Sequence, residues 1–195
     1  MIANIERFFM SPSEYLAWEE QQIYKHEYLN GEAYAMSGGT LGHNQVAVNL
    51  VAMLRSYLRG RGCKVFVNDV KVQVTIKGPY FYPDLVVTCE ERDFQSQKLI
   101  RHPVLVIEIL SPSTESFDRG EKFRQYRQMS SLKDYILIDP QKINVECYRL
   151  NEKDKWELTS YFAEELSNSL LVEFPCINFE CPISAIYEDV EFSIG

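Results

Sequence analysis

Two acidic residues, Asp84 and Glu108, interrupt otherwise apolar stretches of this 195-residue chain. Asp84 precedes three aliphatic residues, and Glu108 stands near the end of the almost wholly apolar segment 104–110. An ionised carboxylate in a dry interior costs several kcal/mol unless it is paired or binds a cation. If the two segments are neighbouring strands, the carboxylates share a face and can hold Mg²⁺ or Mn²⁺, which prefer oxygen ligands. The alternative is that each acid forms a structural salt bridge at the end of a strand.

The elements that would position these acids follow from the hydrophobic periodicity. Alternating residues and turn signals predict five strands around and after the two acids, with a sixth and seventh towards the C-terminus. These strands are expected over residues 63–67, 70–76, 82–88, 104–110, 135–138, 143–150 and 156–162. Apolar residues at helical spacing predict a long helix that ends near Gly60, and a shorter helix is expected over 118–129.

The N-terminal part of the chain carries clear capping and turn signals. Ser11 followed by Pro12 and, three residues after the cap, Glu14 predicts a helix through about residue 20. Asn30-Gly31 predicts a tight turn between strands 24–29 and 32–36. Near the other end, a last short helix is expected after Pro182. The whole pattern predicts one α/β domain over residues 1–195, with a central mixed β-sheet flanked by helices.

Composition limits the cellular setting of the protein. No segment approaches the roughly 20 apolar residues of a spanning helix, and residues 1–7 lack a signal-peptide core. We therefore expect a cytoplasmic protein with no membrane partner. The five cysteines are odd in number and scattered, which predicts reduced thiols rather than disulfides. The net charge of −8 argues against nucleic acid covering much of the surface but allows a local basic site.

At this point the residues resemble a known group of nucleases. Pro83-Asp84, followed 24 positions later by Glu108 after an apolar strand, resembles the motif of the PD-(D/E)XK nuclease superfamily. Segments 82–87 and 105–114, with residues of the following helix, more specifically resemble the bacterial Uma-type restriction endonuclease family over residues 11–150. The resemblance implies a restriction endonuclease-like fold with a core motif region of about 24–140. It also implies metal-dependent hydrolysis of DNA, with Asp84 and Glu108 as catalytic metal ligands.

One departure from the superfamily pattern concerns the catalytic lysine. The pattern places a lysine two residues after the glutamate, where this chain has Leu110. The Uma-type resemblance implies that Lys122, on the next helix, supplies the missing cation. Asp118, Lys122 and Tyr126 are four residues apart and so lie along one helix face. The alternative is a solvated Asp118–Lys122 pair, worth only a few tenths of a kcal/mol.

Further site residues come from the resemblance and from local charge. The resemblance places Glu32 near the metal as a ligand or water orienter, although a residue just after a tight turn is often exposed. His43, Arg119 and Tyr126 are candidate substrate contacts, and a histidine in the first turn of a helix can instead pack or cap. Two basic clusters could bind phosphate or could be solvated helix faces: Arg119, Lys122, Arg124 and Arg127, and Arg55, Arg59, Arg61 and Lys64.

Three classes of function are compatible with these residues. The first is a Mg²⁺- or Mn²⁺-dependent DNA endonuclease, for which a homodimer is expected by analogy with enzymes that cut two strands. The second is a catalytically weak, nuclease-derived module for DNA binding or assembly, which the leucine at position 110 favours. The third, a glycosidase with Asp84 and Glu108 as acid and base, would need no metal, and nothing in the sequence favours it.

Overall fold

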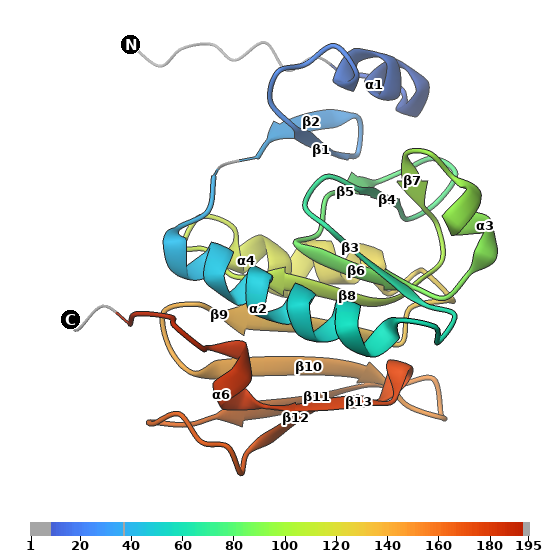
Figure 1. Cartoon of the computed structure of the whole chain (residues 1–195). Helices are drawn as coiled ribbons and strands as arrows, with labels where there is room; N and C mark the ends of the chain where they lie inside the picture. Colours follow the sequence, from blue (N-terminus) through green and yellow to red (C-terminus); the bar gives the residue numbers. More distant parts are fainter. Residues whose placement is uncertain (1–8, 37, 193–195) are drawn as a thin grey trace, which may run out of the picture.

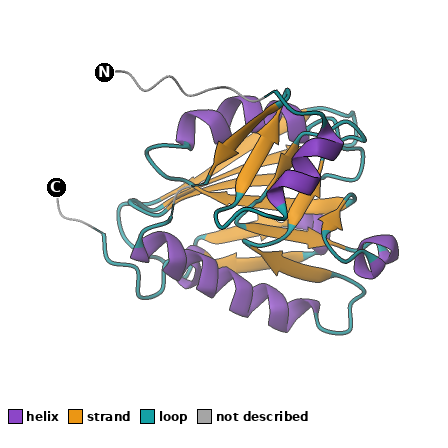
Figure 2. Cartoon of the chain, turned by 90° about the horizontal axis from the view of Figure 1, so that it is seen from above, coloured by secondary structure: helices purple, strands orange, loops and turns teal. Residues whose placement is uncertain are grey.

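The core of the molecule is a six-stranded mixed sheet. The computed structural model describes residues 9–36 and 38–192. Residues 1–7, for which the sequence predicts no signal peptide, lie outside the described residues. Strands β8 and β9 are parallel, and the other neighbouring pairs are antiparallel. The predicted mixed sheet flanked by helices is thus confirmed (Figures 1 and 2). In spatial order the strands are β11 (Trp156–Phe162), β10 (Asn144–Leu150), β9 (Asp134–Asp139), β8 (Pro103–Ile109), β6 (Leu85–Thr88) and β3 (Lys64–Val67).

A second sheet of five short strands contains the predicted N-terminal hairpin. Asn30 and Gly31 adopt the positive φ angles of 51° and 92° that the tight turn requires. The separate sheet is not expected from the sequence, because its other strands are only two or three residues long. Its strands, in spatial order, are β2 (Glu32–Ala35), β1 (His26–Leu29), β5 (Tyr80–Phe81), β4 (Lys71–Gln73) and β7 (Leu99–Ile100).

Helix α2 (Leu41–Leu58) packs along one face of the six-stranded sheet, as Figure 1 shows. In β8, Leu105, Ile107 and Ile109 belong to this side, while Val106 belongs to the core on the opposite face. The strand is therefore buried on both faces, as its apolar sequence predicts. The C-terminal elements join the α2 side of the core: β12 (Leu171–Phe174), the 3₁₀ turn η2 (Pro175–Ile177), β13 (Phe179–Pro182) and α6 (Ile183–Ile186).

The opposite face is covered by the helical segment that follows β8. The helix expected over 118–129 begins earlier, and its middle turn is a π-helix. Its three parts are α4 (Glu115–Phe117), η1 (Asp118–Lys122) and α5 (Phe123–Tyr126). Two peripheral helices complete the fold: α1 (Pro12–Glu19), which has the predicted Ser11–Glu14 capping box, and α3 (Glu91–Gln95). No helix in the described ranges is long and apolar enough to cross a bilayer.

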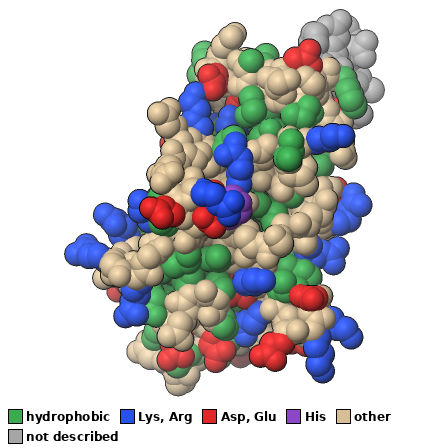
Figure 3. Space-filling view, turned by 90° about the vertical axis from the view of Figure 1, so that its right-hand side faces the viewer, with side chains coloured by type: hydrophobic (Ala, Val, Ile, Leu, Met, Phe, Trp, Pro, Cys, Tyr) green, Lys and Arg blue, Asp and Glu red, His purple; other side chains and the backbone are tan. Residues whose placement is uncertain are grey.

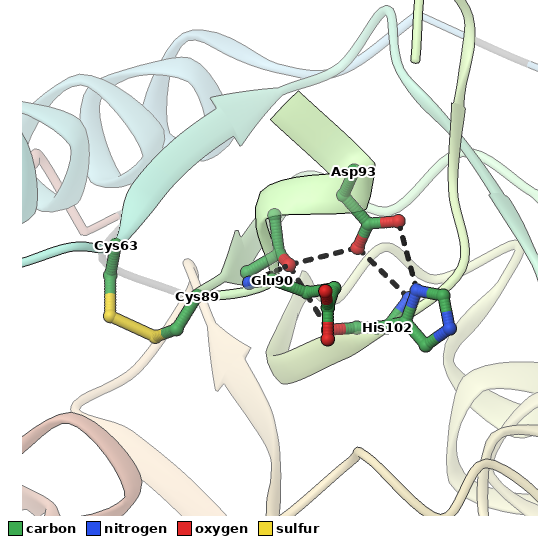
Figure 4. The surroundings of a disulfide bond; sticks show 6 residues. Cys63, Cys89, Glu90, Asp93 and His102 are labelled. Carbon is green, nitrogen blue, oxygen red and sulfur yellow. Dashed lines mark hydrogen bonds and ion pairs between the residues drawn. A yellow bond between two sulfur atoms is a disulfide. The ribbon is translucent and has the colours of Figure 1, made fainter. Parts of the chain in front are cut away.

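The prediction of reduced cysteines is wrong for Cys63 and Cys89, which form a disulfide (Figure 4). In the antiparallel pairing of β3 with β6, Lys64 lies opposite Thr88, so the two cysteines are the next cross-strand partners. Their proximity depends on this register, because they are 26 residues apart in sequence. Cys147, Cys176 and Cys181 are free.

Candidate active site

Asp84 and Glu108 lie opposite each other on neighbouring strands. Leu85 pairs with Ile107 in the β6–β8 ladder, so the next pair towards this end of the sheet is Asp84 and Glu108. Directly opposed residues project from the same face, with Cβ atoms about 5 Å apart. The expectation that the two acids share a face is therefore met by the strand register.

Asp84 stands just before β6 rather than inside the strand expected over 82–88. The chain is irregular at Tyr82 and Pro83, because proline has no N–H for a ladder and the Tyr82 N–H donates to Glu27 Oε1 at 3.0 Å. Asp84 Oδ2 accepts a 2.7 Å hydrogen bond from the Ile109 N–H. This bond fixes the carboxylate against the end of β8.

Lys122 reaches the two-strand site from the helical segment. Its Nζ lies 3.0 Å from Glu108 Oε1, 2.9 Å from Glu27 Oε1 and 3.5 Å from Asp118 Oδ1. Lys122, Glu108 and Asp118 are all at least 95% buried. The alternative of a solvated Asp118–Lys122 pair is therefore wrong, since both groups lie in the interior beside the metal-ligand candidates.

Leu110, rather than a lysine, occupies the position two residues beyond Glu108. Its side chain packs into the core on the same side of β8. The next position on this face of the strand is therefore filled by an apolar side chain. The π-helical turn Asp118–Lys122 brings the ammonium to Glu108 instead, with the Phe81 ring centroid 5.6 Å from Nζ.

Burial and charge act in opposite directions on this cluster. Burial raises the pKa of Glu108 well above its usual range. The charge of Lys122 lowers this pKa, whereas the neighbouring carboxylates raise it further. Burial also raises the pKa of Asp118. Burial alone would lower the pKa of Lys122, but Glu108, Glu27 and Asp118 outweigh it and raise the pKa well above its usual value. Lys122 is therefore a permanent ammonium at the centre of the acids.

His43 joins the site from the first turn of α2. Its Nε2 lies 3.3 Å from Asp84 Oδ1, and both side chains are 18% exposed. Burial alone would lower the pKa of His43, but the hydrogen bond and the charge of Asp84 outweigh it and raise the pKa. The backbone N–H of His43 also donates to the Thr40 side chain, which caps the helix. The imidazole of His43 therefore contacts the carboxylate of Asp84, which is a candidate metal ligand.

Glu27, rather than Glu32, is the hairpin acid in contact with Lys122. The sequence patterns do not identify Glu27 as a site residue. Glu27 is two residues from buried Leu29 on β1 and so lies on the same face of the strand. An acidic residue on a buried strand face is the sequence feature that could have indicated its role. Glu32 lies opposite Leu29 on β2 and accepts a 2.6 Å hydrogen bond from Tyr34. Its role near a metal stays a prediction.

The two candidate substrate contacts on the helical segment differ in their exposure. Tyr126 is fully buried and packs against Phe81, with ring centroids 5.2 Å apart. In this structure Tyr126 is therefore beneath the surface, and the prediction that it contacts substrate is corrected. Arg119 forms ion pairs with Glu115 and Glu146, and its side chain is 28% exposed. Its contact with substrate stays a prediction.

The donor set fits a hard cation only in part. Within residues 9–36 and 38–192, no three His, Cys, Asp or Glu side chains are grouped closely enough to hold a metal. Asp84 and Glu108 nevertheless provide the two carboxylates that Mg²⁺ commonly uses alongside waters and substrate oxygens. Glu108 Oε1 is buried and makes no well-directed hydrogen bond, even though Lys122 is near. The cation beside this oxygen is the Lys122 ammonium, 3.0 Å away.

The mixed sheet and its flanking helices form a restriction endonuclease-like fold. A solved structure described as "a putative nuclease belonging to DUF820" from Anabaena variabilis ATCC 29413 shares this fold, with a TM-score of 0.75 and 17% identity. The match covers 91% of this chain and 97% of that chain.

The family follows from the sequence comparison. The Uma2 family model, described as "Putative restriction endonuclease", matches residues 12–183, and the chain belongs to this family. Two similar relatives are the uncharacterized proteins slr1290 and sll1609 of Synechocystis sp. (strain ATCC 27184 / PCC 6803 / Kazusa). The first is 38% identical over 94% of both chains, and the second is 35% identical over 80% of this chain and 89% of its own.

Proposed function

We propose that this protein is a metal-dependent endonuclease that hydrolyses the phosphodiester bonds of DNA. The observation that carries the proposal is the cross-strand pair of Asp84 and Glu108, with Lys122 Nζ 3.0 Å from Glu108. Two carboxylates and a lysine on one face of a sheet suit a reaction in which negative charge develops on phosphate oxygens. Membership of the Uma2 family supports the same reaction class.

Each residue has a distinct task in this proposal. Asp84 and Glu108 would hold Mg²⁺ or Mn²⁺, which polarises a phosphodiester and lowers the pKa of an attacking water. Lys122 stabilises the negative charge that develops on the phosphate, the task of the lysine absent from position 110. His43 and the Ile109 N–H hold the two oxygens of Asp84, so the carboxylate is oriented before substrate arrives.

A catalytically weak DNA-binding or assembly module is the second candidate. The observation that favours it is that Lys122 is shared by Glu27, Glu108 and Asp118. A lysine neutralised by three carboxylates has less charge to offer to a phosphate than a free one. Such a module would bind DNA without cutting it under any divalent cation.

The partner and assembly follow from the reaction proposed. DNA is the substrate, and a homodimer would present two sites related by a two-fold axis to the two strands. Hydrolysis of chromosomal or plasmid DNA also agrees with the cytoplasmic location expected from the sequence.

A plasmid-nicking assay with Mg²⁺ or Mn²⁺ tests the proposal through Asp84→Asn and Glu108→Gln. Either change should lower the cleavage rate at least about 100-fold, because the carboxylate that would hold the cation is lost. Asp154→Asn and Glu152→Gln, in the exposed turn between β10 and β11, are matched controls and should cut like the unaltered protein. Full cleavage by Asp84→Asn or Glu108→Gln would reject the mechanism. Binding of plasmid without cleavage by the unaltered protein would favour the module.

A further inference from the structure

A cleft of about 560 Å³ opens beside Tyr82, two residues before Asp84. It lies between the end of α1, the edge strand β3 and α3, and we call it the β3 cleft. Figure 3 looks onto the side of the molecule where α3 lies in Figure 1, and shows Lys and Arg side chains among hydrophobic ones. The lining residues used below are Tyr24, Lys64, Phe66, Lys71, Tyr82 and Phe94.

The β3 cleft lies near the candidate active site, because Tyr82, which lines the cleft, is two residues before Asp84. Phe66, on β3, pairs with Val86, and Asp84 is two residues from Val86, so Phe66 and Asp84 are on the same side of the six-stranded sheet. At the end of β3, the Asn68 N–H donates a 3.1 Å hydrogen bond to the Asp84 carbonyl oxygen. From Lys64 to Asn68 the strand direction spans roughly 13 Å. The cleft and Asp84 therefore lie on the same side of the six-stranded sheet.

Two of the four lysines in the β3 cleft form no ion pair with the residues that the structure describes. Lys98 pairs with Glu20 at 2.5 Å, and Lys25 pairs with Asp69. Lys64 contacts the Phe94 ring, with Nζ 4.3 Å from its centroid, and forms no ion pair with any described residue. The fourth cation is Lys71.

Lys71 is a buried ammonium without an anionic partner. The residue is only 7% exposed, yet its Nζ forms no hydrogen bond or ion pair with the residues the structure describes. Its Nζ is instead 5.6 Å from the ring centroids of both Tyr15 and Tyr82. Burial lowers the pKa of Lys71 because the charge is costly to hold there, and the charges of Glu19 and Glu20 offset this cost only in part. An anion that enters the cleft would offset this cost.

The buried acids that line the cleft, Glu19 and Asp93, are held by hydrogen bonds from other groups. Glu19 accepts hydrogen bonds from the Tyr82 hydroxyl at 3.0 Å and from the His26 N–H at 2.9 Å. Asp93 accepts from Thr88 and lies beside His102, as Figure 4 shows. Neither acid forms an ion pair with Lys64 or Lys71 in the described residues, and Glu19 acts on Lys71 only through its charge at longer range.

We propose that the β3 cleft binds the sugar–phosphate backbone of one nucleic-acid strand, with a phosphate at Lys71 and a base stacked on Tyr24. Tyr24 is 74% exposed and lines the same cleft, which gives a base a free aromatic face. Basic groups interleaved with aromatic rings are the usual means of holding a single strand. The proposal rests on the proposed nuclease function for the identity of the partner. What the β3 cleft adds to that function is a binding site for the part of the strand that lies beyond the scissile phosphate.

Fluorescence anisotropy with a 5′-labelled oligothymidylate of about 12 nucleotides tests the proposal. The assay contains EDTA and a KCl series, so no cleavage occurs and binding is measured by itself. Lys71→Met should weaken binding about tenfold or more. It should also reduce the slope of log affinity against log salt by about 0.7, which corresponds to one lost phosphate contact. Lys71→Arg, which keeps the charge, should retain the original slope.

Two further comparisons separate binding from folding. Lys153→Met changes an exposed lysine in the β10–β11 turn and should leave affinity and slope unaltered. Tyr24→Ala affects a side chain too exposed to support the fold and should weaken binding at least about fivefold, while Tyr24→Phe should not.

The outcomes distinguish this proposal from the nuclease proposal. Unchanged affinity and slope in Lys71→Met and Tyr24→Ala, or no binding by the unaltered protein, would overturn the β3 cleft as a strand site, even if plasmid cleavage occurs. Loss of binding in both variants supports the cleft, even if the plasmid assay shows no cleavage.

Discussion

Replacement of Lys122 by methionine tests the buried charge cluster without any metal or substrate. The change keeps the length of the side chain but removes the ammonium that lies within 3.5 Å of Glu27, Glu108 and Asp118. Removal of one partner from a buried ion pair costs about 3–5 kcal/mol, because the remaining charge is left uncompensated. We expect a decrease of this size in the free energy of unfolding at pH 8.

The loss should shrink as the pH falls, and the sign follows from the carboxyl groups. The folded-state pKa of Glu108 is already raised by burial, and loss of Lys122 would raise it further. A carboxyl with a raised folded pKa binds a proton in the native state before the unfolded chain does. Native stability therefore increases as the pH falls through the folded pKa towards the ordinary value. The slope is up to about 1.4 kcal/mol per pH unit for one proton.

In the unaltered protein, the contribution of Lys122 to stability depends on pH in a different way from that of Glu108. Its pKa is raised in the folded state, so its contribution is constant below the ordinary lysine pKa and is lost only as the pH rises through the folded value. Between pH 5.5 and 8 the difference between the two proteins should therefore come from the buried carboxyl charge that the variant leaves without Lys122.

Urea unfolding followed by tryptophan fluorescence at several pH values measures these differences. The double variant Lys122→Met/Glu108→Gln should be more stable at pH 8 than Lys122→Met, because one buried charge has been removed. Lys153→Met, at an exposed turn, should change stability by less than about 0.5 kcal/mol. A pH-independent loss in Lys122→Met, together with additive effects in the double variant, would refute the reasoning.

Two further predictions concern the hairpin acid and the disulfide. Glu27→Gln should reduce plasmid cleavage more than Glu32→Gln, because Glu27 lies 2.9 Å from Lys122 and helps to position its ammonium; equal effects in the nicking assay would contradict the assignment. Cys63→Ser/Cys89→Ser should lower the free energy of unfolding by about 3–4 kcal/mol, since the bond closes a loop between residues 26 apart. Urea midpoints of the variant and of the protein treated with dithiothreitol should agree, and an unchanged midpoint in both would exclude a stabilising disulfide.

Local sequence signals predicted most of the elements correctly. The Ser11 capping box, the Asn30-Gly31 turn and the apolar strand that contains Glu108 depend on residues close together in the chain. The short strands β4, β5 and β7 were not predicted as a separate sheet. Two or three residues carry too little periodicity, and such strands form only when a distant partner supplies their hydrogen bonds.

The candidate site was predicted in part. The apolar surroundings of Asp84 and Glu108 marked them as a pair, and the family resemblance pointed to Lys122. Sequence spacing places Tyr126 on the helix face of Lys122, and local charge makes Arg119 a candidate phosphate contact, but neither signal shows the groups packed against these side chains. The ion pair with Glu146 and the full burial of Tyr126 come from elements distant in sequence.

The sequence by itself determined the types of the main elements, the two acids and the absence of a lysine at position 110, since these depend on residue identity and local spacing. Only the tertiary structure decided that Asp84 faces Glu108, that Glu27 joins Lys122, and that Cys63 meets Cys89. The physical reason is strand register. A slip of one residue reverses the face of every side chain, and packing between segments far apart in the chain fixes that register.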